Sequence, residues 1–329
     1  MSDGPGKIIL GIDLGGTKIL TALVNPEGEI IARDHSITPA SQGQEAVIQS
    51  ILDSTDRVID EADIANADIS AIGIGAPGLS DPQKGILYTS PNLPGWRDVP
   101  LRDIIEKELG APTFLINDAN AAAFGELKYG AGAGSRNFIY ITVSTGIGGG
   151  IIIDGKIYSG SRGMAGELGH MTIKDDGPLC NCGNTGCWET LASGTALARE
   201  ARTSIDGRAE TSILKLAGGD IGKVNAEVIH RAALQGDSLA KELIARAGYY
   251  LGVGLANLIN IFNPEKIVIG GGLSNIGDML LRPAFEEAGK RAFKPAMDSL
   301  RFSRAELGKN SGVIGAAAFA LQELNKPGS

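Results

Sequence analysis

Four potential metal ligands lie close together in the chain, and they include all three of its cysteines. They are His170, Cys180, Cys182 and Cys187. An odd number of closely spaced cysteines is a poor basis for a disulfide framework. Three thiolates and one imidazole, in contrast, complete the tetrahedral ligand set of a structural zinc ion. The sequence therefore predicts one zinc ion bound by these residues, with free buried thiols or a strained disulfide as the alternative.

Two carboxylates flank these ligands. Glu167 precedes His170, and Glu189 follows the last cysteine. If zinc occupies one imidazole nitrogen of His170, the other nitrogen is left to face a second partner. Carboxylates accept hydroxyl protons with a defined geometry, which suits a polyhydroxylated ligand. We therefore expect these three side chains to bind such a ligand, and the alternative is that the glutamates belong to a solvated surface.

Two glycine-rich breaks between apolar runs are candidates for phosphate binding. In the first, Asp13-Leu-Gly-Gly-Thr-Lys18, the glycines expose backbone N–H groups and Thr17 adds a hydroxyl donor. Asp13 sits where a carboxylate could order a hydrated magnesium ion. The second break, Ser144-Thr-Gly-Ile-Gly-Gly149, is similar but lacks the acid. Either break alone is typical of a hairpin turn, but two at equivalent places favour binding of a triphosphate.

Two further positions invite opposing interpretations. Gly271 lies in a run of three glycines after an apolar segment, which suits either a flat nucleoside or a simple tight turn. Asp118 follows Asn117 at the end of another apolar segment, just before an alanine-rich stretch. It could cap the following helix, or it could act as a general base at the carboxyl end of a strand.

The elements that must position these residues follow a repeated pattern. Two three-stranded meanders, about 130 residues apart, each carry a glycine break after the first strand, which favours two related halves over a chance likeness. Between and after them, strands alternate with helices, so the fold class is α/β. Strands are expected at residues 7–12, 19–24, 29–32, 69–75, 113–116, 138–143, 150–153, 156–158 and 266–269. Helices are expected at residues 44–62, 98–109, 119–127, 191–202, 226–235, 238–261 and 312–324.

Composition limits the function classes. The chain has 329 residues, and its 38 acidic against 30 basic side chains give a formal net charge of −8. This balance argues against nucleic-acid binding, which needs clustered Lys and Arg. We expect no membrane association either, because glycines interrupt even the richest apolar stretch and the N-terminus does not resemble a signal peptide. The expected location is the cytoplasm.

These motifs together resemble the ROK family of sugar kinases and repressors, within the actin-like ATPase (ribonuclease H-like) superfold. The likeness runs from residue 8 to about residue 324. The matching pieces are Asp13-Leu-Gly-Gly-Thr-Lys18, Asn117-Asp-Ala-Asn-Ala-Ala122, Ser144-Thr-Gly-Ile-Gly-Gly149, Gly166-Glu-Leu-Gly-His170 and Cys180-Asn-Cys-Gly-Asn-Thr-Gly-Cys-Trp-Glu189. The resemblance implies a duplicated two-domain α/β fold with an interdomain cleft. We expect a small domain at 1–117, joined by the C-terminal helix 312–324, and a larger domain at 118–311.

The resemblance also implies ATP-dependent phosphorylation of a hexose at its 6-hydroxyl, most often of glucose. Asp118 resembles the catalytic base of the family, and Asp13 would act through Mg²⁺. The expected sugar ligands are Gly78, Asn92, Asn117, Asp118, Glu167, His170 and Glu189. The expected phosphate and nucleoside contacts are Gly15, Gly16, Thr17, Lys18, Thr145, Gly146 and Gly271.

Several alternatives stay open from the sequence. The acceptor could be N-acetylmannosamine, N-acetylglucosamine or fructose, and polyphosphate could replace ATP. A sugar-responsive repressor is disfavoured because only about seven residues precede the first strand, too few for a DNA-binding domain. A zinc-dependent binding module is disfavoured because it would not need two phosphate turns. The resemblance implies a homodimer or homotetramer.

Overall fold

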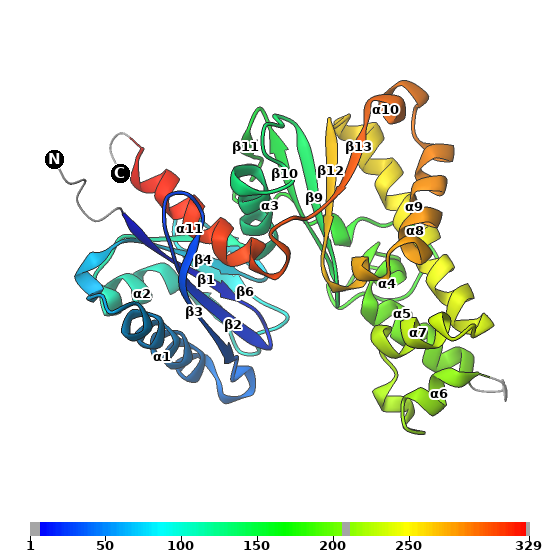
Figure 1. The fold of residues 1–329 in the computed structure, drawn as a ribbon, viewed down its shortest axis with the longest axis horizontal. Coiled ribbons are helices and arrows are strands. Elements are labelled where there is room, and N and C mark those ends of the chain that lie inside the picture. The colour runs from blue at the N-terminus through cyan, green and yellow to red at the C-terminus, as the bar shows by residue number, and fades with distance from the viewer. Residues whose placement is uncertain (1–6, 206–210, 327–329) are drawn as a thin grey trace. The chain divides into compact units, whose positions relative to one another are not determined.

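The structure is a computed structural model that describes residues 7–205 and 211–326. These residues group into two units, and the chain passes between the units four times (Figure 1). Unit 1 comprises residues 7–140, 150–166 and 303–326, and unit 2 comprises residues 141–149, 167–205 and 211–302. Among the described residues, no helix is both long enough and apolar enough to span a membrane.

A mixed five-stranded sheet forms the centre of unit 1, in the order β3-β2-β1-β4-β8. Its strands are β1 (Ile8–Leu14), β2 (Lys18–Val24), β3 (Ile30–Ile37), β4 (Ile69–Ala76) and β8 (Thr113–Asn117). The first three strands form an antiparallel meander, whereas β1, β4 and β8 run parallel. The carboxyl ends of these three parallel strands therefore lie at one edge of the sheet.

Helices cover both faces of this sheet, which explains why its central strands are apolar runs rather than alternating patterns. They are α1 (Gln44–Ala62), α2 (Leu101–Leu109), α3 (Asp118–Tyr129) and α11 (Ser311–Leu324). On one face, Leu10 and Ile12 of β1 belong to a buried cluster with residues of α1 and α2. On the other face, Ile9 clusters with residues of α11. Successive residues of β1 therefore serve two different cores.

Helices α3 and α11 approach each other closely. A side chain at Gly125 would collide with the carbonyl oxygen of Ser311, and one at Gly315 would collide with the carbonyl oxygen of Ala121. Small residues at this crossing thus allow the two backbones to touch, which fixes the start of α11 against the body of α3.

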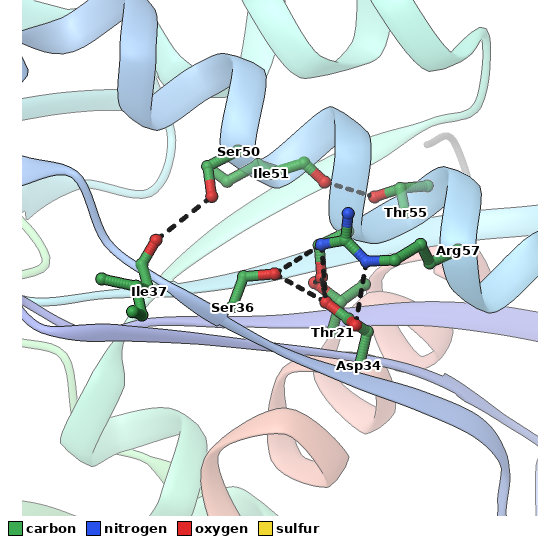
Figure 2. Close-up of polar contacts among 9 residues, drawn as sticks. Thr21, Asp34, Ser36, Ile37, Ser50, Ile51, Thr55 and Arg57 are labelled. Atoms are coloured by element: carbon green, nitrogen blue, oxygen red, sulfur yellow. Dashed lines mark hydrogen bonds and ion pairs between the residues drawn. The ribbon is translucent and has the colours of Figure 1, made fainter.

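A polar network fastens α1 to the edge of the sheet (Figure 2). The Arg57 guanidinium donates from Nε and Nη2 to the two carboxylate oxygens of Asp34 on β3, both at 2.9 Å. Ser54 of α1 is fully buried and donates to the same carboxylate at 2.7 Å. These hydrogen bonds lower the pKa of the Asp34 carboxyl well below its usual range.

The second five-stranded sheet has the order β11-β10-β9-β12-β13. Its strands are β9 (Phe138–Val143), β10 (Ile147–Ile153), β11 (Lys156–Ile157), β12 (Lys266–Gly270) and β13 (Arg301–Arg304). Like the first sheet, it places the first strand of a meander in the centre with two later strands beyond it. The predicted duplicated α/β fold is confirmed by this correspondence.

The remaining helices all lie in unit 2. They are α4 (Glu189–Ala192), α5 (Gly194–Ile205), α6 (Ser212–Leu216), α7 (Ala226–Leu234), α8 (Ser238–Phe262), α9 (Asp278–Arg291) and α10 (Lys294–Ser299). A small antiparallel sheet in unit 1 contains β5 (Leu79–Asp81), β6 (Ile86–Thr89) and β7 (Arg97–Val99). Short 3-10 helices are η1 (Ala40–Gln42), η2 (Asn66–Asp68), η3 (Leu168–His170), η4 (Ile221–Lys223), η5 (Gly272–Ile276) and η6 (Gly308–Asn310).

The structure differs from the sequence-based expectations at several boundaries. The helix expected at 98–109 begins only at Leu101, because residues 97–99 pair as β7 and Pro100 stands at the helix start. The second glycine break is shorter than expected, since Ile147, Gly148 and Gly149 already belong to β10. The domain boundary was expected at residue 117, but unit 1 continues through residue 140 because α3 packs on α11.

Candidate functional site

Two carboxylates, Asp13 and Asp118, flank the carboxyl edge of the parallel strands in unit 1. Asp13 lies near the end of β1 and pairs in register with Gly75 of β4, whereas Asp118 directly follows β8. A Cβ atom on Gly75 would lie 3.7 Å from the Cα atom of Asp118, so the strand position that pairs with Asp13 is a near neighbour of Asp118. Removal from water raises the pKa of the Asp13 carboxyl to about 7, and the neighbouring Asp118 adds to this shift.

The Asp13 carboxylate also meets the beginning of α11. A side chain at Gly312, the second residue of that helix, would overlap the Asp13 carboxylate. The first turn of a helix carries unpaired backbone N–H groups and partial positive charge, which favour a nearby anion. The sequence assigns the helix at 312–324 to the small domain, but it does not predict that the helix begins against Asp13.

The choice between capping and catalysis at Asp118 is clarified by its neighbour. Asn117 is the N-cap of α3, and its side-chain oxygen accepts hydrogen bonds from Ala119 at 3.0 Å and Asn120 at 3.1 Å. Asp118 is the first helical residue, and one of its oxygens accepts from Ala119 at 2.8 Å. Asn117 is thus the N-cap, and Asp118 adds one further hydrogen bond at the helix start.

The first glycine turn spans the three residues between β1 and β2. The N–H group of Gly15 donates to the carbonyl of Lys18 at 2.9 Å, so it closes the turn rather than facing a ligand. Thr38 holds the turn from outside, donating from its hydroxyl to Gly15 at 2.7 Å and from its N–H to Thr17 at 3.0 Å. Thr17 and Lys18 are exposed.

Two other expected sugar contacts, Asn92 and Gly78, lie in the same unit. Asn92 packs over Gly16, where a Cβ atom would come within 2.5 Å of the Cβ atom of Asn92. Gly78 has a positive φ of 96°, and a side chain there would collide with the carbonyl of Thr89. Unit 1 therefore brings Asn92 to the first glycine turn, and it gives Gly78 a conformational reason to be glycine.

The second glycine turn is tied to Glu189 in unit 2. The N–H group of Ile147 donates to Oε2 of Glu189 at 2.9 Å, and a side chain at Gly146 would overlap that same oxygen. The carbonyls of Ser144 and Thr145 accept from Gly194 and Thr195 at the start of α5, at 2.8 and 3.1 Å. One carboxylate oxygen of Glu189 is therefore engaged in holding the turn.

The four predicted metal ligands converge in unit 2. The ligand atoms of His170, Cys180, Cys182 and Cys187 all lie within 4.8 Å of one another. Sγ of Cys182 is 3.7 Å from Sγ of Cys187, and Sγ of Cys180 is 3.6 Å from Nδ1 of His170. A tetrahedral zinc ion with Zn–S of 2.3 Å and Zn–N of 2.0–2.1 Å would separate these atoms by about 3.8 and about 3.6 Å. The residues therefore fit zinc, and the sulfurs of Cys182 and Cys187 are not bonded to each other.

Tight turns shape the loop around this cluster. Gly183 and Gly186 have φ values of 90° and 69°, in the left-handed region that favours glycine. A side chain at Gly186 would also collide with the carbonyl of Lys174. The N–H group of Cys180 donates to the carbonyl of Asn184 at 2.8 Å, which closes the loop between the ligands.

The zinc-ligand loop also places the expected sugar-binding groups. With Nδ1 of His170 turned to the thiols, Nε2 lies 4.0 Å from Oε2 of Glu167. Partial burial raises the pKa of the Glu167 carboxyl, the neighbouring His170 lowers it, and Glu189 raises it again. Glu167, His170 and Glu189 are therefore close enough to influence one another.

Gly271 follows β12 with a φ of 86°, and a side chain there would collide with the backbone of Val143 at the end of β9. This close approach explains why the position requires glycine. In the described residues, the expected site positions thus form one group in unit 1 and another in unit 2.

The chain belongs to the ROK family, whose sequence pattern matches residues 9–323. It is 41% identical to the glucokinase of Halalkalibacterium halodurans over 317 residues, which cover 96% of each chain. It is 33% identical to the xylose repressor of Caldicellulosiruptor bescii over 316 residues, which cover 96% of this chain and 78% of the repressor. Among solved structures, it is similar to a ROK family glucokinase from Streptomyces griseus in complex with glucose and AMPPNP. The TM-score is 0.85 at 36% identity, covering 96% of this chain and 99% of that chain.

Proposed function

We propose that this protein is an ATP-dependent hexose kinase that phosphorylates glucose at its 6-hydroxyl. The observation that carries the proposal is the near full-length similarity to glucokinases, together with an acidic pair in unit 1 and the carboxylate–imidazole group in unit 2. Phosphoryl transfer needs positioning and charge stabilisation more than covalent catalysis, and these residue types supply both.

In this proposal, Asp118 accepts the proton of the sugar 6-hydroxyl as that oxygen attacks the γ-phosphorus of ATP. Its place at the start of α3, next to the Asn117 cap, gives the carboxylate a rigid support. Magnesium, when bound, neutralises charge on the phosphates, and Asp13 is the residue that would hold it through its water shell. Thr17, Lys18, Thr145 and Gly146 would contact the phosphates, and Gly271 would lie near the nucleoside.

Glu167, His170 and Glu189 would accept or donate hydrogen bonds to the sugar hydroxyls, with Gly78, Asn92 and Asn117 as further contacts. We infer that zinc on the Cys₃His set has a structural role, because four protein ligands leave no open position for a substrate. Its contribution is to hold the His170 ring so that Nε2 faces Glu167.

The test is a coupled ADP-release assay with ATP and Mg²⁺ on the zinc-loaded protein. The sugars are glucose, mannose, fructose, N-acetylglucosamine and N-acetylmannosamine, and polyphosphate is tried in place of ATP. We expect glucose to give the highest kcat/KM. Asp118→Asn should lower kcat by about 10²-fold or more, because it removes the proton acceptor, whereas the exposed Asp60→Asn on α1 serves as the matched control.

Preference for an N-acetylhexosamine or for fructose would replace the substrate but keep the reaction. Absence of turnover on every sugar, by protein that contains one zinc per chain and melts cooperatively, would overturn the proposal. The repressor alternative then gains weight, and glucose binding without turnover is the result that would favour it.

A further inference from the structure

Glu126 is a fully buried carboxylate near the end of α3 that plays no part in the proposed chemistry. Its Oε2 accepts from the N–H groups of Ala131 at 2.8 Å and Glu306 at 3.1 Å. Its Oε1 accepts from the N–H group of Leu307 at 3.0 Å and lies 2.9 Å from the hydroxyl of Ser311. All of these partners can donate, so the position is built for a side chain that only accepts hydrogen bonds.

The neighbouring chain is shaped to reach this carboxylate. A side chain at Gly130 would overlap Oε2 of Glu126, and the residues that donate to Oε1 come from just before and at the start of α11. Glu306 and Leu307 follow closely on residue 303, where the chain re-enters unit 1. Glu126 thus ties the last turns of α3 to the segment that leads into α11.

The start of α11 connects this buried carboxylate to the acidic pair. Ser311, which contacts Glu126, is followed by Gly312, against which the Asp13 carboxylate lies. The other end of α3 begins with Asp118. Glu126 is therefore connected to Asp118 through helix α3. It is connected to Asp13 through Ser311 and the next residue, Gly312.

We propose that Glu126 is a positioning residue for phosphoryl transfer, which holds the first turn of α11 against the Asp13 carboxylate and so sets the arrangement of Asp13 and Asp118. This inference rests on the proposed function. Without the four hydrogen bonds to Glu126, the first turn of α11 is free to shift away from Asp13. Misplacement of a catalytic group by about 1 Å can cost about 10²-fold in rate.

The test uses two substitutions and two controls on the zinc-loaded protein. Glu126→Gln places an amide donor against backbone donors. Ser311→Ala removes the hydroxyl contact with Glu126 together with the 3.0 Å hydrogen bond of that hydroxyl to the carbonyl of Gly308. Glu287→Gln is the acid-to-amide control, since Glu287 is buried in α9 of unit 2 and binds Lys290 and Arg291. Ser54→Ala is the control for a lost buried hydroxyl in unit 1.

We expect Glu126→Gln to lower kcat by about tenfold or more and Ser311→Ala by about threefold, because both release the first turn of α11. The dissociation constant for glucose, measured by calorimetry, should change less than about threefold, because Glu167, His170 and Glu189, which would bind the sugar hydroxyls, lie outside the segments that Glu126 holds. Both controls should keep kcat within about twofold of the unmodified protein even where they lower Tm. Equal losses of kcat in variants and controls would overturn the proposal.

A second readout does not depend on turnover. Asp13→Asn is combined with Ser311→Ala and, separately, with Ser54→Ala, and the changes in Tm are compared. If Ser311 transmits the effect of Glu126 to Asp13, the first pair should deviate from additivity by about 2 °C or more, while the second pair adds. Additivity in both pairs would contradict the proposal, even if the protein phosphorylates none of the sugars. Absence of sugar phosphorylation by the unmodified protein, in contrast, contradicts only the proposed function.

Discussion

The Asp13 carboxylate lies against the first turn of α11 and is influenced by Asp118, and its ionisation is costly in the folded protein. Its pKa is raised from 3.8 to about 7 by removal from water and by Asp118. Between these two values, the folded state keeps a proton that the unfolded state has released. The contribution of this group to stability is therefore present at low pH and is lost as pH rises toward 7.

We expect Asp13→Asn to raise the Tm of the ligand-free protein at pH 8 by a few degrees, because the amide cannot acquire the unfavourable charge. The gain should shrink as pH is lowered from 8 to 5. Thermal melts across this range check the prediction, with the exposed Asp60→Asn as the matched control. A gain that stays constant with pH would contradict the ionisation argument. The same variant should lose turnover, since an amide is a poor substitute for the carboxylate toward hydrated magnesium.

At the scale of elements, the segment from η3 to α4 carries the four predicted metal ligands as well as the fully buried Trp188. Its three thiols and the imidazole of His170 converge. Burial raises the pKa of the Cys187 thiol to about 12. Zinc binding must therefore displace protons from these thiols. If zinc is bound here, as we propose, its removal would take a shared support away from Glu167 and Glu189.

We expect removal of zinc by a chelator to lower Tm. We also expect it to weaken glucose binding by about tenfold or more, because loss of the groups that orient a binding side chain typically has an effect of this size. Metal content measured by mass spectrometry and glucose binding measured by calorimetry check the prediction. Cys187→Ser should reproduce both effects, whereas Asn181→Ser, at an exposed position in the same loop, should reproduce neither. Unchanged glucose binding in the zinc-free protein would show that the loop holds its shape alone.

Helix α1 offers a second test at this scale, because its polar contacts with β3 involve none of the residues in the proposed chemistry (Figure 2). The Arg57 hydrogen bonds lower the pKa of Asp34 in the folded state, so the stability they add is present above pH 4 and is lost as pH falls further. Asp34→Asn should lower Tm at pH 7 by a few degrees and leave kcat within about twofold. The difference in Tm should narrow below pH 4, and a difference that does not depend on pH would contradict the assignment.

At the scale of the whole molecule, the two units share strands. The chain passes between the units at residues 140, 149, 166 and 302, and both β9 and β10 contribute residues to each unit. Strands that serve two units cannot detach from one without disturbing the other. We therefore expect calorimetry to show a single cooperative unfolding transition, with equal calorimetric and van't Hoff enthalpies. Two resolved transitions would contradict this expectation.

Much of this organisation is predictable from the sequence because it depends on local patterns. The meanders, the glycine turns and the Cys₃His set are encoded in short segments whose residue types restrict the backbone or bind one kind of ligand. The expected helix at 98–109 includes residues 98 and 99, which belong to strand β7 in the structure. The reason is that β7 exists only through pairing with β6, which no local pattern reveals.

The roles of Asn117, Gly312 and Glu126 were decided by tertiary structure. A buried glutamate in an alanine-rich helix looks like an ordinary exposed residue, and three of its four hydrogen-bond partners are 180 to 185 positions away along the chain. Asn117 rather than Asp118 is the N-cap of α3, because β8 ends at Asn117 and the helix begins at the next residue. The sequence by itself thus determined most of the elements, the family and the chemistry available, but it did not predict the small sheet β5–β7, strand β13 or the helices α6, α9 and α10. Only the tertiary structure decided which groups meet, because such contacts join segments that are far apart along the chain.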